Sequence, residues 1–340
     1  MYFYPAQKCV KLALCLLSVS PLLANLASAQ KVIATIPATD GVLGNPMTMA
    51  VNPLTNRLYI AGGAVEVVDQ KNNNILQTIS VGGGSLSDIA VDPVRRMAYV
   101  FDDADSVTPS LYAINLTTNT IVNSLSTNAG YPPPMLALNP VTNRLYVELP
   151  SGITVIDASS FAQIASIPYS QTGPPAQITV NPATNRIYML YNLFPGFMQV
   201  IDGSTNTTIT TMTGLAELAI SLDIDPFRNL IYVSGEFGQV SVVNGATNTL
   251  VTTINNIPGQ PGGISVDPAN RKVYLANFAL NQVQIIDEAT NTLESTTIPV
   301  GAGPENTAID YVHGLLYVGN TDENGNYVPN GTTVSVIKLN

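Results

Sequence analysis

The chain has 340 residues, of which 46% are hydrophobic and 11% are charged, and its formal net charge is −10. This acidic balance excludes DNA and RNA as general partners, because nucleic-acid binding depends on neutralising phosphates with cationic side chains. The cysteines, Cys9 and Cys15, both lie close to the N-terminus, and His313 is the single histidine. The sequence therefore argues against Cys–His or Ser–His–Asp catalysis and against metal sites built from several histidines.

Residues 1–29 are predicted to form a secretory signal peptide. Lys8 and Lys11 precede an apolar core at 12–23, and Ala27-Ser28-Ala29 is a small-residue cleavage site. The apolar core is shorter than the ~20 residues that span a bilayer, and no later run approaches that length. We therefore expect an exported protein, periplasmic, extracellular or on the cell surface. We expect its mature part, residues 30–340, to be a single domain without a membrane span.

From residue 31 onward the chain repeats one unit. In each copy an Asn or Asp, here called position zero, is followed seven residues later by Tyr. The pairs are Asn52/Tyr59, Asp92/Tyr99, Asn139/Tyr146, Asn181/Tyr188, Asp225/Tyr232, Asp267/Tyr274 and Asp310/Tyr317, with Tyr spacings of 40, 47, 42, 44, 42 and 43 residues. A period in the low forties predicts a β-propeller when each unit contains four strands.

The sixth copy, Gly263 to Val300, shows the four strands most clearly. Short apolar runs at 264–266, 273–276, 283–287 and 293–298 alternate with turn residues, which is typical of an antiparallel meander. The last copy ends after its third strand, at 333–339, and an unassigned strand, Lys31–Ile36, begins the mature chain. We therefore predict an all-β fold, a seven-bladed β-propeller of four-stranded antiparallel blades. Residues 31–36 should complete the last blade and so remove an open sheet edge.

Two segments resemble the consensus of the YVTN-repeat β-propeller family. Asn181-Pro-Ala-Thr-Asn-Arg-Ile-Tyr188 and Val283–Gly301 match it nearly residue by residue, and the resemblance extends over residues 31 to 339. The resemblance implies an exported propeller that is distantly similar in architecture to lactonase-type propellers. The catalytic residues of the lactonase-type propellers have no counterpart in this sequence. The resemblance is specific for the fold and carries little about function, since most members are repeat scaffolds.

The two faces of such a ring differ in their chemistry. First-to-second and third-to-fourth turns form what we call the bottom face, and they hold at least eight of the 11 Lys and Arg that follow residue 30. The other loops form the top face, which is rich in acidic and aromatic residues. Variable loops on a rigid scaffold often carry function. The predicted ligand-binding residues are Asp88, Asp223, Tyr131, Tyr191, Phe197, Glu236, Phe237 and Phe278.

No cofactor is predicted from the sequence, although two acidic top loops contain oxygen ligands that suit Ca²⁺. The candidate metal ligands are Asp102, Asp103, Asp105, Asp322 and Asn324. Neither loop is an EF-hand, because the position that would need a Glu is Gly331 in the second loop, so solvated hairpin tips are the competing interpretation.

The sequence favours a non-catalytic, monomeric scaffold whose acidic, aromatic top face binds a partner protein, a glycan or a small ligand. Two alternatives stay open. One is a lactonase-like hydrolase or another propeller enzyme that uses top-face carboxylates, with or without Ca²⁺. The other is a structural component of the cell surface or envelope. A tight central pocket with a metal would favour the enzyme, and self-assembly would favour the structural role.

Overall fold

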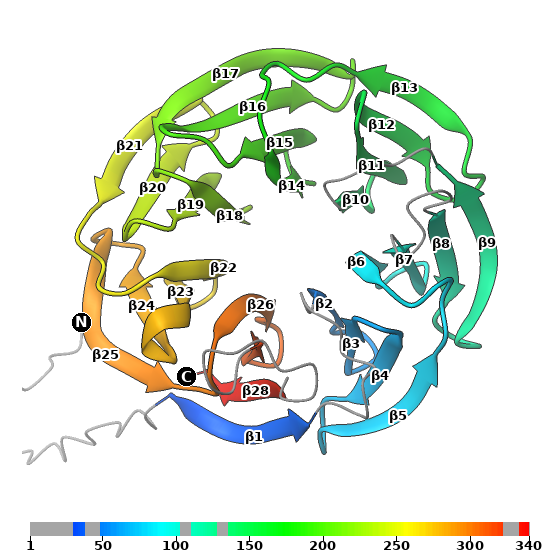
Figure 1. Cartoon of the computed structure of the whole chain (residues 1–340), viewed down its shortest axis with the longest axis horizontal. Coiled ribbons are helices and arrows are strands. Elements are labelled where there is room, and N and C mark those ends of the chain that lie inside the picture. Colours follow the sequence, from blue (N-terminus) through cyan, green and yellow to red (C-terminus); the bar gives the residue numbers. More distant parts are fainter. Residues whose placement is uncertain (1–29, 38–47, 103–109, 128–134, 322–332, 340) are drawn as a thin grey trace, which may run out of the picture.

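The computed structural model describes residues 30–37, 48–102, 110–127, 135–321 and 333–339. The predicted signal peptide, residues 1–29, lies outside the described residues. The chain forms seven four-stranded antiparallel sheets that stand around a central axis as the blades of a propeller (Figure 1). The predicted fold class is therefore confirmed.

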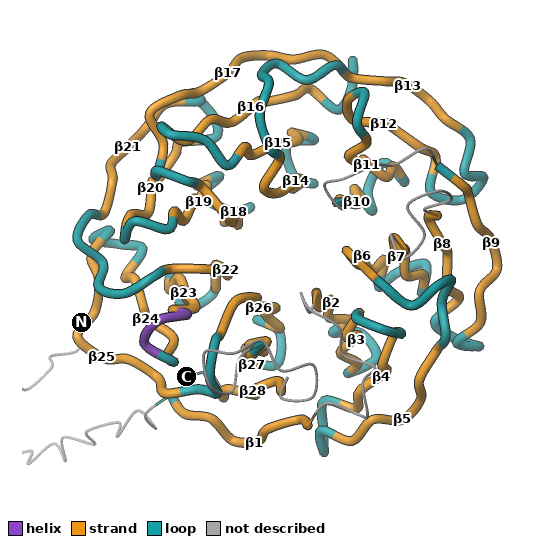
Figure 2. The backbone as a smooth tube through the Cα atoms, in the orientation of Figure 1, coloured by secondary structure: helices purple, strands orange, loops and turns teal. Residues whose placement is uncertain are grey.

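The first strand of each blade lies nearest the axis and the fourth lies on the outside of the ring (Figure 2). Blade 1 consists of β2 (Thr48–Asn52), β3 (Arg57–Ala61), β4 (Val65–Asp69) and β5 (Asn74–Ile79). Blade 2 consists of β6 (Leu86–Asp92), β7 (Met97–Asp102), β8 (Ser110–Asn115) and β9 (Thr120–Ser126). Blade 3 consists of β10 (Leu136–Asn139), β11 (Arg144–Leu149), β12 (Gly152–Asp157) and β13 (Gln163–Ile167). Blade 4 consists of β14 (Pro175–Asn181), β15 (Arg186–Tyr191), β16 (Gly196–Asp202) and β17 (Thr207–Leu215).

The remaining blades follow the same order. Blade 5 consists of β18 (Ala219–Asp225), β19 (Leu230–Gly235), β20 (Gln239–Asn244) and β21 (Thr249–Ile254). Blade 6 consists of β22 (Pro261–Asp267), β23 (Lys272–Asn277), β24 (Gln282–Asp287) and β25 (Thr292–Pro299), with a 3₁₀ turn, η1 (Phe278–Leu280), before β24. Blade 7 consists of β26 (Pro304–Asp310), β27 (Leu315–Asn320), β28 (Thr333–Lys338) and β1 (Lys31–Pro37). No helix in these described segments is long and apolar enough to cross a membrane.

The N-terminal strand closes the ring, as predicted. β1 pairs antiparallel with β28, from Lys31 opposite Lys338 to Pro37 opposite Thr333, and Figure 1 shows the two ends of the colour scale side by side. Ile36 is 1% exposed and packs into a core cluster with Leu58 and Ile60 of blade 1. The hydrogen bonds therefore complete blade 7 with the N-terminal strand, and the burial of Ile36 packs that blade against blade 1.

The residue at position zero repeats because it builds a turn. In all seven blades its side-chain oxygen accepts a hydrogen bond from the backbone N–H two residues later, as in Leu54 N to Asn52 Oδ1 at 3.1 Å. The residue four places after position zero then has a positive φ in every blade, such as 53° at Asn56 and 63° at Gly314. Asn and Gly adopt this conformation at the least cost. The turn chemistry thus explains the repeated Asn/Asp and much of the Asn content.

The repeated Tyr supplies the core. All seven are at most 1% exposed, and each packs between its own blade and a neighbouring one. Tyr317 of blade 7, for example, shares a cluster with Leu58 and Ile60 of blade 1. Because one blade cannot bury both of its faces, these contacts link stability to completion of the ring.

Candidate functional site

Charge is segregated between the two faces more completely than the bottom turns alone suggest. Three Lys add to the Arg and Lys of the first-to-second turns: Lys31 at the bottom end of β1, Lys71 in the β4–β5 turn and Lys338 at the bottom end of β28. Every Lys and Arg after residue 30 therefore lies on the bottom face. Several form ion pairs there, such as Arg57 Nη1 with Asp69 Oδ1 at 3.2 Å and Lys272 Nζ with Asp287 Oδ2 at 2.7 Å.

The first strands carry a repeated irregularity at their top ends. In blades 2, 4, 5, 6 and 7 the pairing of the first and second strands shifts register. Each shift lies next to the residue that precedes position zero by four places. Such a bulge turns an extra side chain toward the axis, and bulges often lie beside functional sites. The extra residues include Ser87 in blade 2, Ile220 in blade 5 and Glu305 in blade 7.

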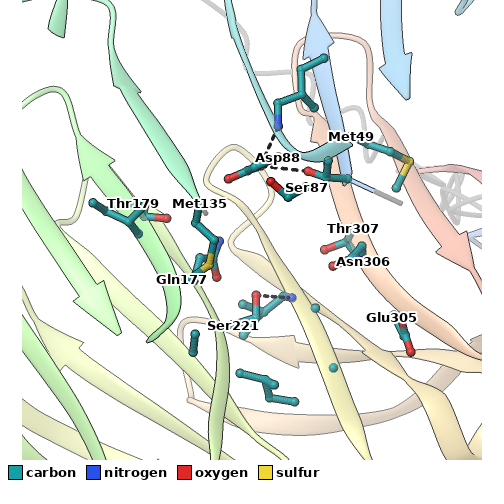
Figure 3. A pocket seen from close by; sticks show the side chains of 18 of the residues that line it. Met49, Ser87, Asp88, Met135, Gln177, Thr179, Ser221, Glu305, Asn306 and Thr307 are labelled. Atoms are coloured by element: carbon teal, nitrogen blue, oxygen red, sulfur yellow. Dashed lines mark hydrogen bonds between the residues drawn. The ribbon is translucent and has the colours of Figure 1, made fainter. Parts of the chain in front are cut away.

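These bulges surround a cavity at the top mouth of the central channel. Its volume is about 810 Å³, and residues from all seven blades line it (Figure 3). Its polar lining comes from the bulges and from the residues four before position zero, which include Thr48, Asp88, Gln177, Ser221 and Asn306. The size lies within the range of small-molecule sites in proteins.

Asp88 is the most constrained carboxylate of this lining. Its Oδ1 accepts hydrogen bonds from Thr48 Oγ1 at 3.0 Å and from Ile89 N at 2.8 Å, and its Oδ2 accepts one from Leu136 N at 2.9 Å. The side chain keeps some exposure to the channel, yet burial raises the pKa of Asp88 to about 6. The hydrogen bonds oppose this shift because they favour the ionised form. Asp88 therefore links blades 1, 2 and 3 and also faces the cavity.

Asp223 occupies a different level of the channel. It lies opposite Tyr232 near the middle of β18 and is outside the lining of the cavity. Its Oδ2 accepts a hydrogen bond from Val266 N of blade 6 at 2.8 Å, so it links two blades as Asp88 does. Burial raises the pKa of Asp223 to about 6, with a smaller contribution from the charge of Asp225.

Two more of the predicted ligand-binding residues line the cavity, and a third is the sequence neighbour of one of them. Glu236 and Phe278 line it directly, and Phe237 follows Glu236 in the loop between β19 and β20. Phe237 is 59% exposed and meets Phe194, which is 66% exposed, with ring centroids 6.4 Å apart in a T-shaped arrangement. This aromatic pair bridges blades 4 and 5 and is open to solvent.

The other predicted aromatic residues lie elsewhere. Tyr191 is fully buried, donates from its hydroxyl to Gln199 Oε1 at 3.0 Å, and meets Phe197 with ring centroids 5.4 Å apart. Tyr191 belongs to the core cluster between blades 3 and 4, and the half-buried Phe197 packs against that cluster. Tyr131 lies outside the described residues, and its proposed role stays a prediction.

Among the predicted metal ligands, Asp102 is the one within the described residues. Its carboxylate accepts hydrogen bonds from the backbone N–H groups of Gly83 and Ser85, and so anchors the loop before β6. Asp103, Asp105, Asp322 and Asn324 lie outside the described residues. Within the described segments, no group of three or more His, Cys, Asp or Glu is placed to hold a metal ion. Calcium binding therefore stays a prediction.

Sequence reasoning did not name most of the polar residues that line the cavity. Asp88 drew attention because it stands four residues before position zero. The same offset identifies Thr48, Gln177, Ser221 and Asn306 in other blades. The repeat register was therefore a sufficient signal for this set, whereas Glu305 depends on a bulge that only the pairing reveals.

Comparison with known proteins identifies the fold of the chain but no family to which it belongs. No protein-family model matches the chain, and no curated protein sequence matches it either. Among solved structures, a chain of the Kuenenia stuttgartiensis hydrazine synthase superposes with a TM-score of 0.71 and 18% identity, over 88% of this chain and 97% of that one. A chain of the mitotic checkpoint complex superposes with a TM-score of 0.73 and 14% identity, over 100% of this chain and 98% of that one. At these identities the likeness shows a β-propeller scaffold.

Proposed function

We propose that this chain is an exported, non-catalytic propeller of the YVTN-repeat type that binds a partner protein on its top face. The partner would present a basic surface with exposed apolar side chains. The observation that carries the proposal is the solvent-exposed pair Phe194 and Phe237, on a face where the described residues include no Lys or Arg. Aromatic residues are enriched at protein interfaces and provide large contact areas there.

The surroundings of the pair support a built surface. Glu236 N donates to Leu218 O at 3.3 Å, and Leu218 N donates to Leu193 O at 3.0 Å, which ties the loops of blades 4 and 5 together. A Cβ at Gly235 would lie 2.4 Å from Glu217 O, so glycine permits this close approach. Glu217 and Glu236 thus flank the aromatic pair on a fixed backbone. Carboxylates beside exposed rings favour a cationic partner, because charge attracts it and the rings bind its cations and apolar groups.

The test uses matched aromatic substitutions on the two faces. Phe194→Ser combined with Phe237→Ser removes the top pair, and Phe227→Ser removes a Phe that is 76% exposed in a bottom turn. Each purified protein is immobilised and exposed to secreted and envelope fractions of the native organism, and bound proteins are quantified by mass spectrometry. We expect the double variant to lose a specific basic partner by roughly tenfold or more, as hot-spot aromatic residues do.

The Phe227→Ser protein should retain the partner, and added salt should weaken the complex. Equal recovery by all three proteins would contradict the proposal, as would a loss confined to Phe227→Ser. Melting temperatures serve as the folding control, because exposed side chains contribute little to stability.

A further inference from the structure

We propose that the cavity at the top mouth of the channel is a binding site for a small organic amine. This inference does not rest on the partner-binding surface, because the Phe194–Phe237 pair that carries that surface is outside the cavity lining; Glu236 borders both. The amine would enter from the top face with its ammonium groups among the lining carboxylates and its carbon chain against the apolar lining.

The shape and lining of the cavity fit a ligand of this class. A volume of about 810 Å³ accommodates a small molecule together with several waters. Met49, Met135, Ile220 and Phe278 provide apolar wall between the polar side chains. Methionine adapts to varied shapes and an aromatic face attracts cations, so this wall suits an alkyl chain that ends in an ammonium group.

The charge of the lining selects for a cation. Asp88, Glu236 and Glu305 contribute carboxyl groups from blades 2, 5 and 7, and no Lys, Arg or His is among the lining residues. All Lys and Arg of the described chain lie on the opposite face. A cleft lined by one sign of charge concentrates ions of the other sign, most strongly where protein walls exclude water. An ammonium group would be the first positive charge in this space.

The polar groups are held in place before a ligand arrives. Asp88 accepts three hydrogen bonds from blades 1, 2 and 3. Gln177 Oε1 accepts one from Leu222 N of blade 5 at 2.6 Å, and Ser221 Oγ accepts one from Ile264 N of blade 6 at 3.4 Å. Figure 3 shows hydrogen bonds of Asp88 and Ser221 among the residues that line the cavity. Such fixed groups reduce the ordering cost of binding.

The arrangement of the carboxyl groups favours an organic amine over a metal ion. A calcium ion gathers six to eight oxygen atoms at ~2.3–2.6 Å, which requires convergent carboxylates. The three lining carboxyl groups stand on separate blades, and the described residues contain no metal-binding group of three. Dispersed negative charge is better matched by a ligand whose positive charges are also spread along a chain.

Isothermal titration calorimetry with three four-carbon probes tests this inference. Putrescine is the dication, butane-1,4-diol is its neutral counterpart and succinate is the dianion, all used at equal ionic strength. We expect putrescine to bind with a Kd below about 1 mM and to raise the melting temperature, since it binds the folded state. Butane-1,4-diol and succinate should bind at least tenfold more weakly.

A matched set of variants locates the site. Glu236→Gln combined with Glu305→Gln removes two lining charges and should weaken putrescine binding at least fivefold. Glu217→Gln removes a top-face charge outside the lining and should change the affinity less than twofold. Asp88→Asn removes the third lining carboxylate and should also weaken putrescine binding. If Asp88→Asn does not fold, Glu236→Gln alone still tests the role of the lining charges.

Three results would overturn the inference. They are no putrescine binding at about 10 mM, equal binding of the diol and the diamine, and unchanged affinity in the Glu236→Gln/Glu305→Gln protein. The Phe194→Ser/Phe237→Ser protein should bind putrescine normally. Failure of the amine site and failure of the partner surface can therefore be told apart.

Discussion

At the scale of single residues, the repeated Tyr has a buried ring and a hydroxyl whose hydrogen bonding differs between blades. Tyr188 is fully buried, and its hydroxyl has no hydrogen-bond partner among the described residues. Tyr274 differs, because its hydroxyl accepts a hydrogen bond from Gln30 Nε2 at 2.8 Å. The repeated Tyr is therefore kept in blade 4 by the volume and apolar area of its ring, and the hydroxyl contributes little.

Substitutions at Tyr188 should separate these contributions. We expect Tyr188→Ala to lower the free energy of unfolding by about 3–5 kcal/mol, because it leaves a cavity between two blades. Tyr188→Phe should change it by less than about 1 kcal/mol, since no hydrogen bond is lost. Urea denaturation followed by circular dichroism measures both. A near-neutral Tyr188→Ala would show that the ring is not a core residue.

At the scale of elements, the bottom turns of neighbouring blades meet through a buried carboxyl group. Glu288 follows β24 and is 2% exposed. Its Oε2 lies 3.3 Å from Arg228 Nη1 and 3.7 Å from Arg271 Nε. Burial and the neighbouring Asp225 raise the pKa of Glu288 to about 7, although both arginines oppose the shift. The contact between blades 5 and 6 therefore favours the neutral acid.

This contact should make stability depend on pH. A carboxyl group whose pKa is higher in the folded state than its ordinary value of 4.5 stabilises the fold when protonated. That contribution is present below pH 4.5 and is lost as the pH rises through 7. We expect the free energy of unfolding to fall by on the order of 2 kcal/mol from this group between pH 5 and 7.5, and Glu288→Gln to remove most of that fall.

Asp287→Asn is the matched control for this experiment. Its partner Lys272 lowers the pKa of Asp287 to about 2, so its contribution changes below the chosen pH window. Urea denaturation at pH 5 and at pH 7.5 compares the three proteins. If Glu288→Gln keeps the pH dependence of the unsubstituted protein, another group is responsible for it.

At the scale of the whole molecule, ring closure and charge segregation are the two organising features. The sequence after residue 15 contains no cysteine, so no disulfide joins the two ends of the ring. The pairing of β1 with β28 and the burial of Ile36 carry out that task. Within the described ring, every Lys and Arg lies on the bottom face and none on the top, which orients any charged partner relative to the ring.

Two substitutions in β1 test the importance of closure. Ile36→Asp places a charge at a site that is 1% exposed, whereas Ile33→Asp places it at a site that is 49% exposed in the same strand. We expect Ile36→Asp to cost at least about 3 kcal/mol and to promote aggregation through the freed edge of β28. Ile33→Asp should cost less than about 0.5 kcal/mol. Thermal melting and light scattering measure both, and equal melting of the two variants would contradict a role of β1 in closure.

The sequence alone determined the propeller, its blade number and its closing strand. These follow from local rules: turn residues at a fixed offset, apolar strands between them and a buried Tyr in each unit. The tertiary structure decided which residues meet across blades. It placed Tyr191 in the core with Phe197 packed against it, placed Glu236 and Phe278 at the cavity, and brought Phe194 against Phe237. Contacts between blades depend on shifts in strand pairing and on how closely the loops of neighbouring blades approach each other. The sequence pattern of a single repeat unit does not encode either of these.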